Sequence, residues 1–299
     1  MRVGVIGIGS NSIRMLLSDV ENGAIRQVLR SREGTRLFAG MEQNNGNMAE
    51  ENILSSLDAI SAFRAKALSM GVEDMHLFAT SAVRDSANGA DFAQRVLDAT
   101  GLELEICPGE REAALSFLGA TSGERAGVLD IGGGSTEYVI GEGSRIDAAF
   151  SLKMGAVRLY DRCPIRNRED ARHVVHIAKD ILAPCLPKLL HAGLPDSWYG
   201  TGGTLTTMGA IVRGIYWDDK TYLHGAIITR DDVENTLDYL SRLTVEERRA
   251  IPAISVKRAD IIVHGIAILA ASMEALSIET MTVSEKGNMD GYIKEKYLK

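Results

Sequence analysis

Cysteine is scarce in this chain of 299 residues, and long apolar runs, low-complexity stretches and an excess of positive charge are missing. The three cysteines, Cys107, Cys163 and Cys185, lie far apart, and no CxxC or metal-type spacing occurs. An odd number of isolated cysteines argues against a disulfide framework and against a cysteine-based metal site. We therefore expect a reduced, cytoplasmic protein with buried thiols.

Apolar segments long enough to cross a membrane are also missing. The most apolar helical candidate, residues 259–276, contains Asp260, His264 and Glu274, so it suits a protein core better than a bilayer. The N-terminal strand runs into a Gly/Asn turn by residue 9 and lacks the apolar stretch of a signal peptide. We expect neither a membrane partner nor a secretion signal.

Positive charge is in deficit, because 33 Lys and Arg residues against 40 Asp and Glu residues give a net charge of −7. This balance argues against broad, non-specific binding of nucleic acid, although a local basic cleft could still hold a polyanion. Hydrophobic residues at 45% and charged residues at 24% are typical of a soluble globular protein. The length suits two domains.

Two glycine/serine loops, each following an apolar strand, are the most informative feature that is present. The first is Gly7-Ile8-Gly9-Ser10-Asn11-Ser12, and the second is Asp130-Ile131-Gly132-Gly133-Gly134-Ser135. Such turns let backbone N–H groups and small hydroxyls close around a phosphate. A single loop could equally be a tight β-turn, but a matched pair indicates two similar halves that hold one phosphorylated ligand.

The order of the predicted elements supports two similar halves. In the first half we expect strands at 3–8, 13–20, 24–31, 75–79 and 102–107, and helices at 50–70, 91–99 and 110–118. In the second half we expect strands at 127–131, 136–140, 145–151, 198–199 and 280–283. The helices there are expected at 169–191 (interrupted by Pro184 and Pro187), 205–212, 231–242, 245–250, 256–276 and 288–297. The loop around 119–125 predicts domains of 1–122 and 123–299.

The sequence resembles the Ppx/GppA phosphatases, which are exopolyphosphatases and guanosine pentaphosphate phosphohydrolases. The resemblance rests on blocks in the right order over nearly the whole chain: residues 9–14, 80–85, 109–113, 130–137, 155–159, 200–204, 258–260 and 283–287. It implies an α/β fold of two ribonuclease H-like βββαβαβα domains, of the actin/hexokinase/Hsp70 class, with a cleft between them.

Phosphoanhydride hydrolysis needs groups that neutralise phosphate oxygens and a group that aligns water. We expect phosphate contacts from the two loops and from a helix N-terminus after residue 201: Ser10, Asn11, Ser12, Gly132, Gly133, Gly134, Ser135, Gly202, Gly203 and Thr204. The third of these sites could equally be a capped turn with no ligand. The resemblance also places Arg84 at the substrate, and Arg36 is a weaker candidate for the same cleft. A surface ion pair of Arg84 with Asp85 or Glu112 is the alternative.

Three carboxylates are candidates for catalysis. By resemblance Glu112 is the catalytic glutamate, as a general base or a water-orienting group. The alternative is an acid in the first turn of a helix, a description that Glu110 also fits. Asp130 and Glu137 flank the second loop, and a hairpin there would bring both toward the phosphate as ligands of Mg²⁺ or another divalent cation such as Mn²⁺. Asp130 could instead stabilise a turn.

Gly7 is the main departure from the family pattern, which normally has an aspartate there that helps to hold the metal. The lack of this carboxylate puts the strength of metal binding, and turnover, in question. Pro108 stands where a serine is usual. His173 and His176 have a metal-like spacing, but no third ligand is near them in sequence, so a solvated helix face is the simpler interpretation.

These observations favour a Mg²⁺-dependent hydrolase that removes terminal phosphate from inorganic polyphosphate. A guanosine pentaphosphate phosphohydrolase is the close alternative, because the phosphate motifs suit both substrates. A third possibility is a sensor that binds polyphosphate or an alarmone with weak turnover because of Gly7. The chain resembles short members of the family without an additional C-terminal helical domain, so we expect little processivity. A homodimer is possible.

Overall fold

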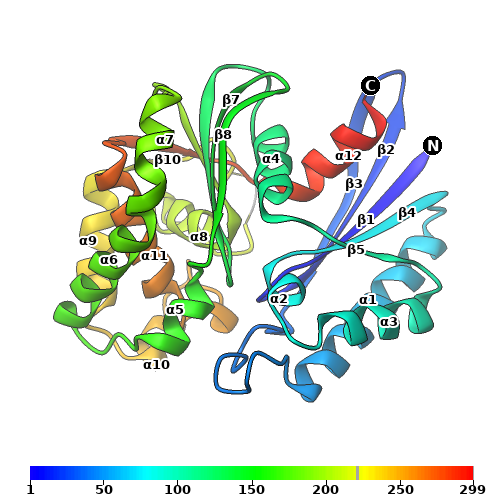
Figure 1. Cartoon of the computed structure of the whole chain (residues 1–299), viewed down its shortest axis with the longest axis horizontal. Helices are drawn as coiled ribbons and strands as arrows, with labels where there is room; N and C mark the ends of the chain where they lie inside the picture. Colours follow the sequence, from blue (N-terminus) through cyan, green and yellow to red (C-terminus); the bar gives the residue numbers. More distant parts are fainter. Residues whose placement is uncertain (220–221, 299) are drawn as a thin grey trace.

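The first lobe is built around a five-stranded mixed sheet in the order β3-β2-β1-β4-β5 (Figure 1). The structure, a computed structural model, describes residues 1–219 and 222–298. The strands are β1 (Arg2–Ile8), β2 (Ile13–Glu21), β3 (Ala24–Glu33), β4 (Asp74–Ala79) and β5 (Leu104–Ile106). Helices α1 (Glu50–Ser69), α2 (Ser81–Arg84), α3 (Gly89–Thr100) and α4 (Gly109–Ala120) follow the strands in the expected order.

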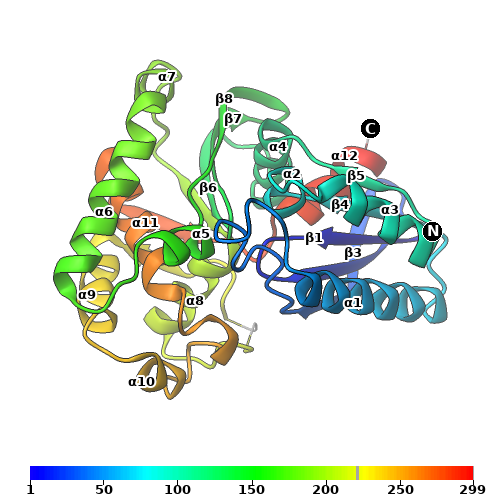
Figure 2. The same cartoon turned by 60° about the horizontal axis from the view of Figure 1, so that its bottom comes forward.

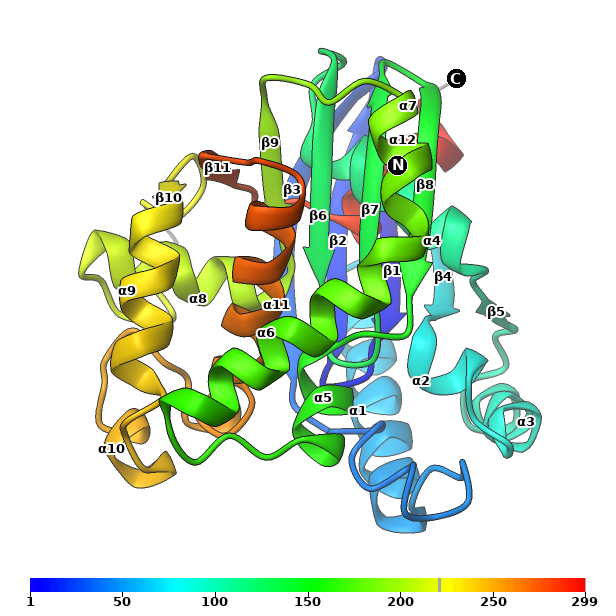
Figure 3. The same ribbon diagram turned by 60° about the vertical axis from the view of Figure 1, so that its left-hand side comes forward.

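The second lobe repeats this plan around a six-stranded sheet in the order β10-β11-β9-β6-β7-β8. Its strands are β6 (Ala126–Ile131), β7 (Thr136–Glu142), β8 (Arg145–Leu152), β9 (Trp198–Thr201), β10 (Ile227–Thr229) and β11 (Thr280–Val283). Its helices are α5 (Ala156–Arg162), α6 (Arg168–Leu182), α7 (Leu186–His191), α8 (Gly202–Arg213), α9 (Arg230–Leu240), α10 (Val245–Arg249), α11 (Ile262–Ala275) and α12 (Asn288–Tyr297). Figure 3 shows α6, α9 and α11 along one side of this sheet.

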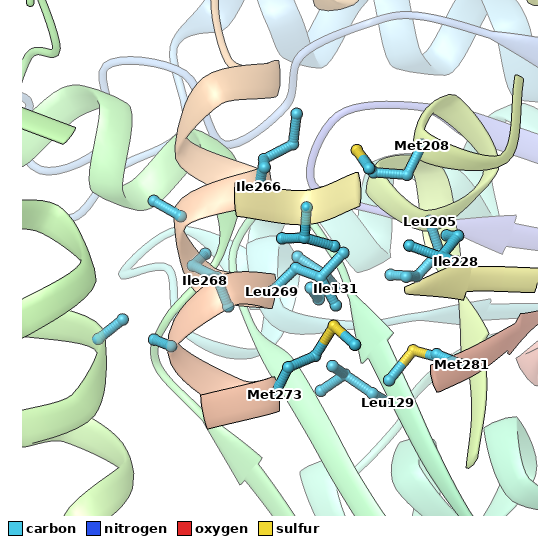
Figure 4. Close-up of a cluster of buried hydrophobic side chains, with 14 of the residues drawn as sticks. Leu129, Ile131, Leu205, Met208, Ile228, Ile266, Ile268, Leu269, Met273 and Met281 are labelled. Atoms are coloured by element: carbon cyan, nitrogen blue, oxygen red, sulfur yellow. The ribbon is translucent and has the colours of Figure 1, made fainter. Parts of the chain in front are cut away.

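The larger core lies between the second sheet and α11. Leu129 and Ile131 of β6 pack there with Leu269 and Met273 of α11 (Figure 4). Helix α11 is apolar on nearly its whole circumference, as a helix enclosed by a sheet and other helices must be. No helix in the described part of the chain is both long and apolar enough to span a membrane.

The last helix of each half covers the sheet of the other half. Helix α4 packs on β6, β7 and β8, whereas α12 returns to the first lobe and packs on β1 and β2. The two helices touch through glycines, since a Cβ on Gly119 would lie 1.9 Å from Gly287 O and one on Gly291 would lie 1.9 Å from Leu115 O. Any side chain at either glycine would push the helices, and with them the lobes, apart.

The element order agrees with the prediction apart from the short helices α2 and α5, which were not predicted, and several local differences. Helix α11 begins at Ile262 rather than at 256, because residues 256–258 form a separate 3-10 turn. Helix α8 begins three residues earlier than expected, at Gly202, and the edge strand β10 was not predicted. The interruption at Pro184 and Pro187 is confirmed, since a 3-10 turn separates α6 from α7. The predicted boundary at residues 122 and 123 falls in the loop between α4 and β6 and stays a prediction.

Candidate active site

The two glycine/serine loops have the same backbone geometry. Gly9 N donates to Ser12 O at 3.1 Å, and Gly132 N donates to Ser135 O at 3.0 Å. Each loop joins two antiparallel strands, β1 to β2 in one lobe and β6 to β7 in the other. The loops also meet, because a Cβ on Gly133 would lie 3.1 Å from Ser10 Cβ. The expectation of matched openings of two similar halves is therefore confirmed in the backbone.

A cleft opens where these loops meet. Most of the predicted site residues line it: Ser10, Asn11, Ser12, Glu112, Asp130, Gly132, Gly133, Ser135, Glu137, Gly202 and Gly203. The side-chain Oδ1 of Asn11 is buried and has no hydrogen-bond partner among the described residues. An amide side chain of this kind, facing the cleft, is available to a ligand.

The equivalent strand ends of the two lobes carry opposite charge. In the second lobe Asp130 stands directly opposite Glu137 across the β6–β7 pair. In the first lobe the equivalent positions are Gly7 and Arg14, which are opposite each other across β1 and β2. The second lobe therefore supplies two carboxylates to the cleft, and the first lobe supplies a guanidinium and no carboxylate from these positions.

Glu112 joins these carboxylates from the first turn of α4. Its Oε2 accepts a hydrogen bond of 2.9 Å from Arg84 Nη1, and the residue is 5% exposed. Burial raises the pKa of Glu112 to about 7, although the Arg84 guanidinium opposes the shift. A carboxylate with such a pKa can take a proton from water near neutral pH.

Asp130 and Glu137 are buried as well, and each has a hydrogen-bonded hydroxyl. Ser116 Oγ donates to Asp130 Oδ2 at 2.7 Å, and Ser151 Oγ donates to Glu137 Oε1 at 2.7 Å. Burial raises the pKa of both carboxyls, and the charges of Glu112 and Asp130 raise the pKa of Glu137 further. Three acids that repel one another in this way would be stabilised by a cation among them.

A cluster of arginines faces these acids. Arg14, Arg32 and Arg258 line the cleft, and none has an ion pair with a described residue. Arg14 and Arg32 are directly opposite each other on β2 and β3. Among the described residues, Arg14 donates to Asn288 Oδ1 and Arg32 donates to Ser12 Oγ. Burial and the two neighbouring arginines lower the pKa of Arg258 well below its usual range. Arg258 is buried, Arg14 is half-buried and Arg32 is exposed. A cluster of guanidinium groups with no carboxylate partner among the described residues indicates a site for an anion.

The sequence reasoning did not assign a role to these arginines. Arg14 and Arg258 lie inside motif blocks that were noted, but Arg32 lies at the end of β3, outside every block. Three residues that come from β2, from β3 and from the turn before α11 meet only in the folded chain. No local spacing marks them.

Some predicted residues lie beside the main cleft rather than in its lining. Arg84 donates to Glu112 and to Cys107 O, and it lines a second pocket. Thr204 points toward Gly265 of α11, and Gly134 O accepts a hydrogen bond from Arg158 Nε. Arg36 forms an ion pair of 2.7 Å with Asp260 of the second lobe.

The donor set fits a hard divalent cation only in part. No group of three His, Cys, Asp or Glu residues within the described ranges is arranged to hold a metal by itself. Asp130 and Glu137 offer carboxylate oxygens on neighbouring strands, beside the loop hydroxyls. Mg²⁺ commonly takes one or two carboxylates and completes its shell with phosphate oxygens and water. The residues present therefore fit a cation that arrives together with a phosphate.

Comparison with known proteins decides the family. The model of the Ppx/GppA phosphatase family matches residues 16–299. The chain belongs to the Ppx/GppA phosphatase family. Exopolyphosphatase 1 of Mycobacterium tuberculosis is 32% identical over 99% of this chain and 88% of its own length. The guanosine-5'-triphosphate,3'-diphosphate pyrophosphatase of Photobacterium profundum is 28% identical over 97% of this chain and 58% of its own length.

The fold of this Ppx/GppA chain agrees with a solved relative. The crystal structure of an exopolyphosphatase-like protein superimposes with a TM-score of 0.91, at 26% identity, over 99% of this chain and 97% of the other. The predicted two-lobed α/β fold is thus confirmed. The family match and the relatives named as exopolyphosphatases confirm the prediction that the protein is a hydrolase.

Proposed function

We propose that this protein hydrolyses the terminal phosphoanhydride bond of inorganic polyphosphate, with Mg²⁺ as its cofactor. One observation carries the proposal: arginines without carboxylate partners and three buried acids face each other in one cleft between matched loops. The arginines and loop amides suit the phosphate oxygens, and the acids suit a cation and a water molecule. The Mycobacterium tuberculosis relative, named as an exopolyphosphatase, supports this substrate class.

In this proposal the terminal phosphate lies between Ser135 and the first loop, and Glu112 orients the attacking water. The water oxygen forms a bond to the terminal phosphorus as the bridging P–O bond breaks. The water proton passes to Glu112, and the bridging oxygen leaves as an anion on the shortened chain. Arg14, Arg32 and Arg258 neutralise charge on the chain. Mg²⁺, held by Asp130 and Glu137, would supply charge neutralisation for the phosphate oxygens.

The first test measures phosphate release from medium-chain polyphosphate and, separately, from guanosine pentaphosphate, each with Mg²⁺. We expect Glu112→Ala to lower the rate at least about a hundredfold, because a lost general base typically has an effect of this size. The matched control is Glu103→Ala, an exposed acid before β5. Faster release from guanosine pentaphosphate at equal concentration would replace the proposed substrate. Binding of both ligands without any release would show a sensor rather than an enzyme.

A further inference from the structure

A second pocket lies directly behind the candidate catalytic acids. It is lined by the end of α2, the start of α4 and the end of β8: Arg84, Asp85, Gly109, Glu110, Ser135, Ser151 and Lys153. Figure 2 shows α2 and α4 together beside β7 and β8 at the junction of the lobes. The proposed chemistry leaves this space without a role.

Two hydrogen-bonded pairs separate this pocket from the main cleft. Glu112 faces the cleft and accepts from Arg84, which faces the pocket. Glu137 faces the cleft and accepts from Ser151, which faces the pocket. Ser135 lines both spaces. The partition between them is therefore made of side chains rather than of backbone, so rotation of a side chain can open it.

The proposed function creates a need for a second opening. In an exo-acting hydrolase the terminal phosphate lies deepest, next to Glu112, and the rest of the chain extends past the arginines toward the mouth. The released orthophosphate is then enclosed by the remaining chain on one side and by the acids on the other. It can leave promptly only through the side that the chain does not fill.

We propose that the second pocket binds the released orthophosphate and is its exit path. This inference rests on the proposed function. When Glu112 takes the proton of the attacking water, it becomes neutral and its ion pair with Arg84 weakens. The Arg84 guanidinium keeps Cys107 O and, at 3.7 Å, Asp85 as partners, but Glu112 no longer competes with the phosphate that has just formed next to it. Reaction and opening of the partition are coupled through this one side chain.

The charges around the pocket suit weak, transient binding of a phosphate. Arg84 and Lys153 are positive, and Asp85 and Glu110 are negative. Asp85 binds Arg158 through Oδ2 at 2.6 Å, whereas its Oδ1 lies farther from the two pocket cations, 3.7 Å from Arg84 and 3.8 Å from Lys153. These longer pairs leave both cations able to contact a phosphate. Lys153 is 72% exposed at its side chain and lies 3.8 Å from Asp85, so it stands at the outer mouth of the pocket.

Two variants of opposite charge test the proposal. Lys153→Glu removes the cation at the outer mouth, and Glu110→Lys adds one. The probe is radiolabelled inorganic phosphate, measured by equilibrium dialysis and as a product inhibitor. We expect Lys153→Glu to weaken phosphate binding at least about threefold and Glu110→Lys to strengthen it by a similar factor, because charge reversal near the ligand acts in opposite directions. Lys66→Glu, at an exposed residue of α1 that lines neither pocket, is the matched control.

A second titration distinguishes phosphate binding in the second pocket from phosphate binding in the main cleft. In the Glu112→Gln enzyme, bound polyphosphate fills the main cleft without turnover. Phosphate binding is then measured in this enzyme alone and in combination with Lys153→Glu or Glu110→Lys. If phosphate affinity is still lowered by Lys153→Glu and raised by Glu110→Lys, the exit pocket is supported. If both variants bind phosphate as tightly as Lys66→Glu does, the exit pocket is overturned. If the wild-type enzyme releases no phosphate while the opposite shifts remain, the hydrolase proposal falls and the phosphate site stands.

Discussion

At the residue scale, the repulsion among the buried acids is the dominant feature. Asp130 and Glu137 are directly opposite on adjacent strands, a placement of like charges that destabilises a sheet. The chain keeps this arrangement because Ser116 and Ser151 donate to the two acids and because Arg84 pairs with Glu112. The site is therefore suited to a ligand that brings positive charge. When that ligand is absent, repulsion among the acids lowers the stability of the protein.

This cost predicts that neutralising Glu137 stabilises the free protein. The folded pKa of Glu137 lies well above the ordinary 4.5, mainly through burial. The folded state thus holds its proton more tightly than the unfolded state, so stability falls as pH rises from about 4.5. Glu137→Gln removes this loss and keeps an acceptor for Ser151. We expect its Tm at pH 8 in EDTA to rise by at least about 2 °C, with little change at pH 4.

The control for this experiment is Glu21→Gln, an exposed acid at the end of β2. Activity should fall in Glu137→Gln although stability rises, which separates a functional acid from a structural one. A Tm at pH 8 at or below that of Glu21→Gln would contradict the assignment of Glu137 as a destabilising charge.

At the scale of elements, the sequence predicted the two loops and the acids but not the arginines. The loops and acids lie within short motifs on consecutive strands, whereas the arginine cluster depends on register. The β2–β3 turn pairs Glu21 with Ala24, and that register continued would place Arg14 opposite Ser31. A bulge at Leu17 and Ser18 shifts the pairing by one residue, so that Arg14 meets Arg32. A one-residue shift in register moves the side chains of a strand to the opposite face of the sheet, and the local sequence pattern does not show where such a shift occurs.

The missing aspartate at residue 7 is also an element-scale feature, because α12 fills its place. A Cβ on Gly7 would lie 3.2 Å from Met289 Cγ and 3.4 Å from the ring of Phe78. In the other lobe the equivalent Asp130 meets Ser116 of α4 instead. We therefore expect Gly7→Asp alone to destabilise the protein by about 1–3 kcal/mol through overpacking.

Adding Met289→Ser should recover part of that stability, because it gives the new carboxylate space and a hydroxyl. The double variant should also reach half-maximal phosphate release at a lower Mg²⁺ concentration than the wild type. Unfolding curves and a Mg²⁺ titration measure the two effects, with Met289→Ser alone as the control. A Mg²⁺ titration that matches the control would show that Asp130 and Glu137 suffice.

At the scale of the whole molecule, ion pairs join the two lobes on the side of the cleft opposite the α4–α12 contact. Glu33 ends β3 and Arg36 follows it in the first lobe. Glu33 pairs with Lys257 at 2.5 Å and Arg36 pairs with Asp260 at 2.7 Å, both in the second lobe. Arg258, which faces the cleft, lies between these two partners in sequence. The turn at 256–260 therefore holds the lobes together and presents Arg258 to the cleft at the same time.

This arrangement predicts that the two ion pairs favour the closed cleft. The Glu33–Lys257 pair is exposed and weak, whereas Asp260 is largely buried, so the Arg36–Asp260 pair should contribute most. We expect Arg36→Ala with Lys257→Ala to raise KM for polyphosphate about three- to tenfold with a smaller change in kcat, because closure then depends more on substrate binding energy. Small-angle scattering of the free variant should show a larger radius of gyration, and added substrate should reverse it. Arg26→Ala, which removes an exposed ion pair within the first lobe, is the control. A double variant that matches Arg26→Ala in both KM and radius of gyration would show that these two ion pairs do not set the position of the lobes, which the α4–α12 contact and the buried Arg158–Asp85 pair then hold.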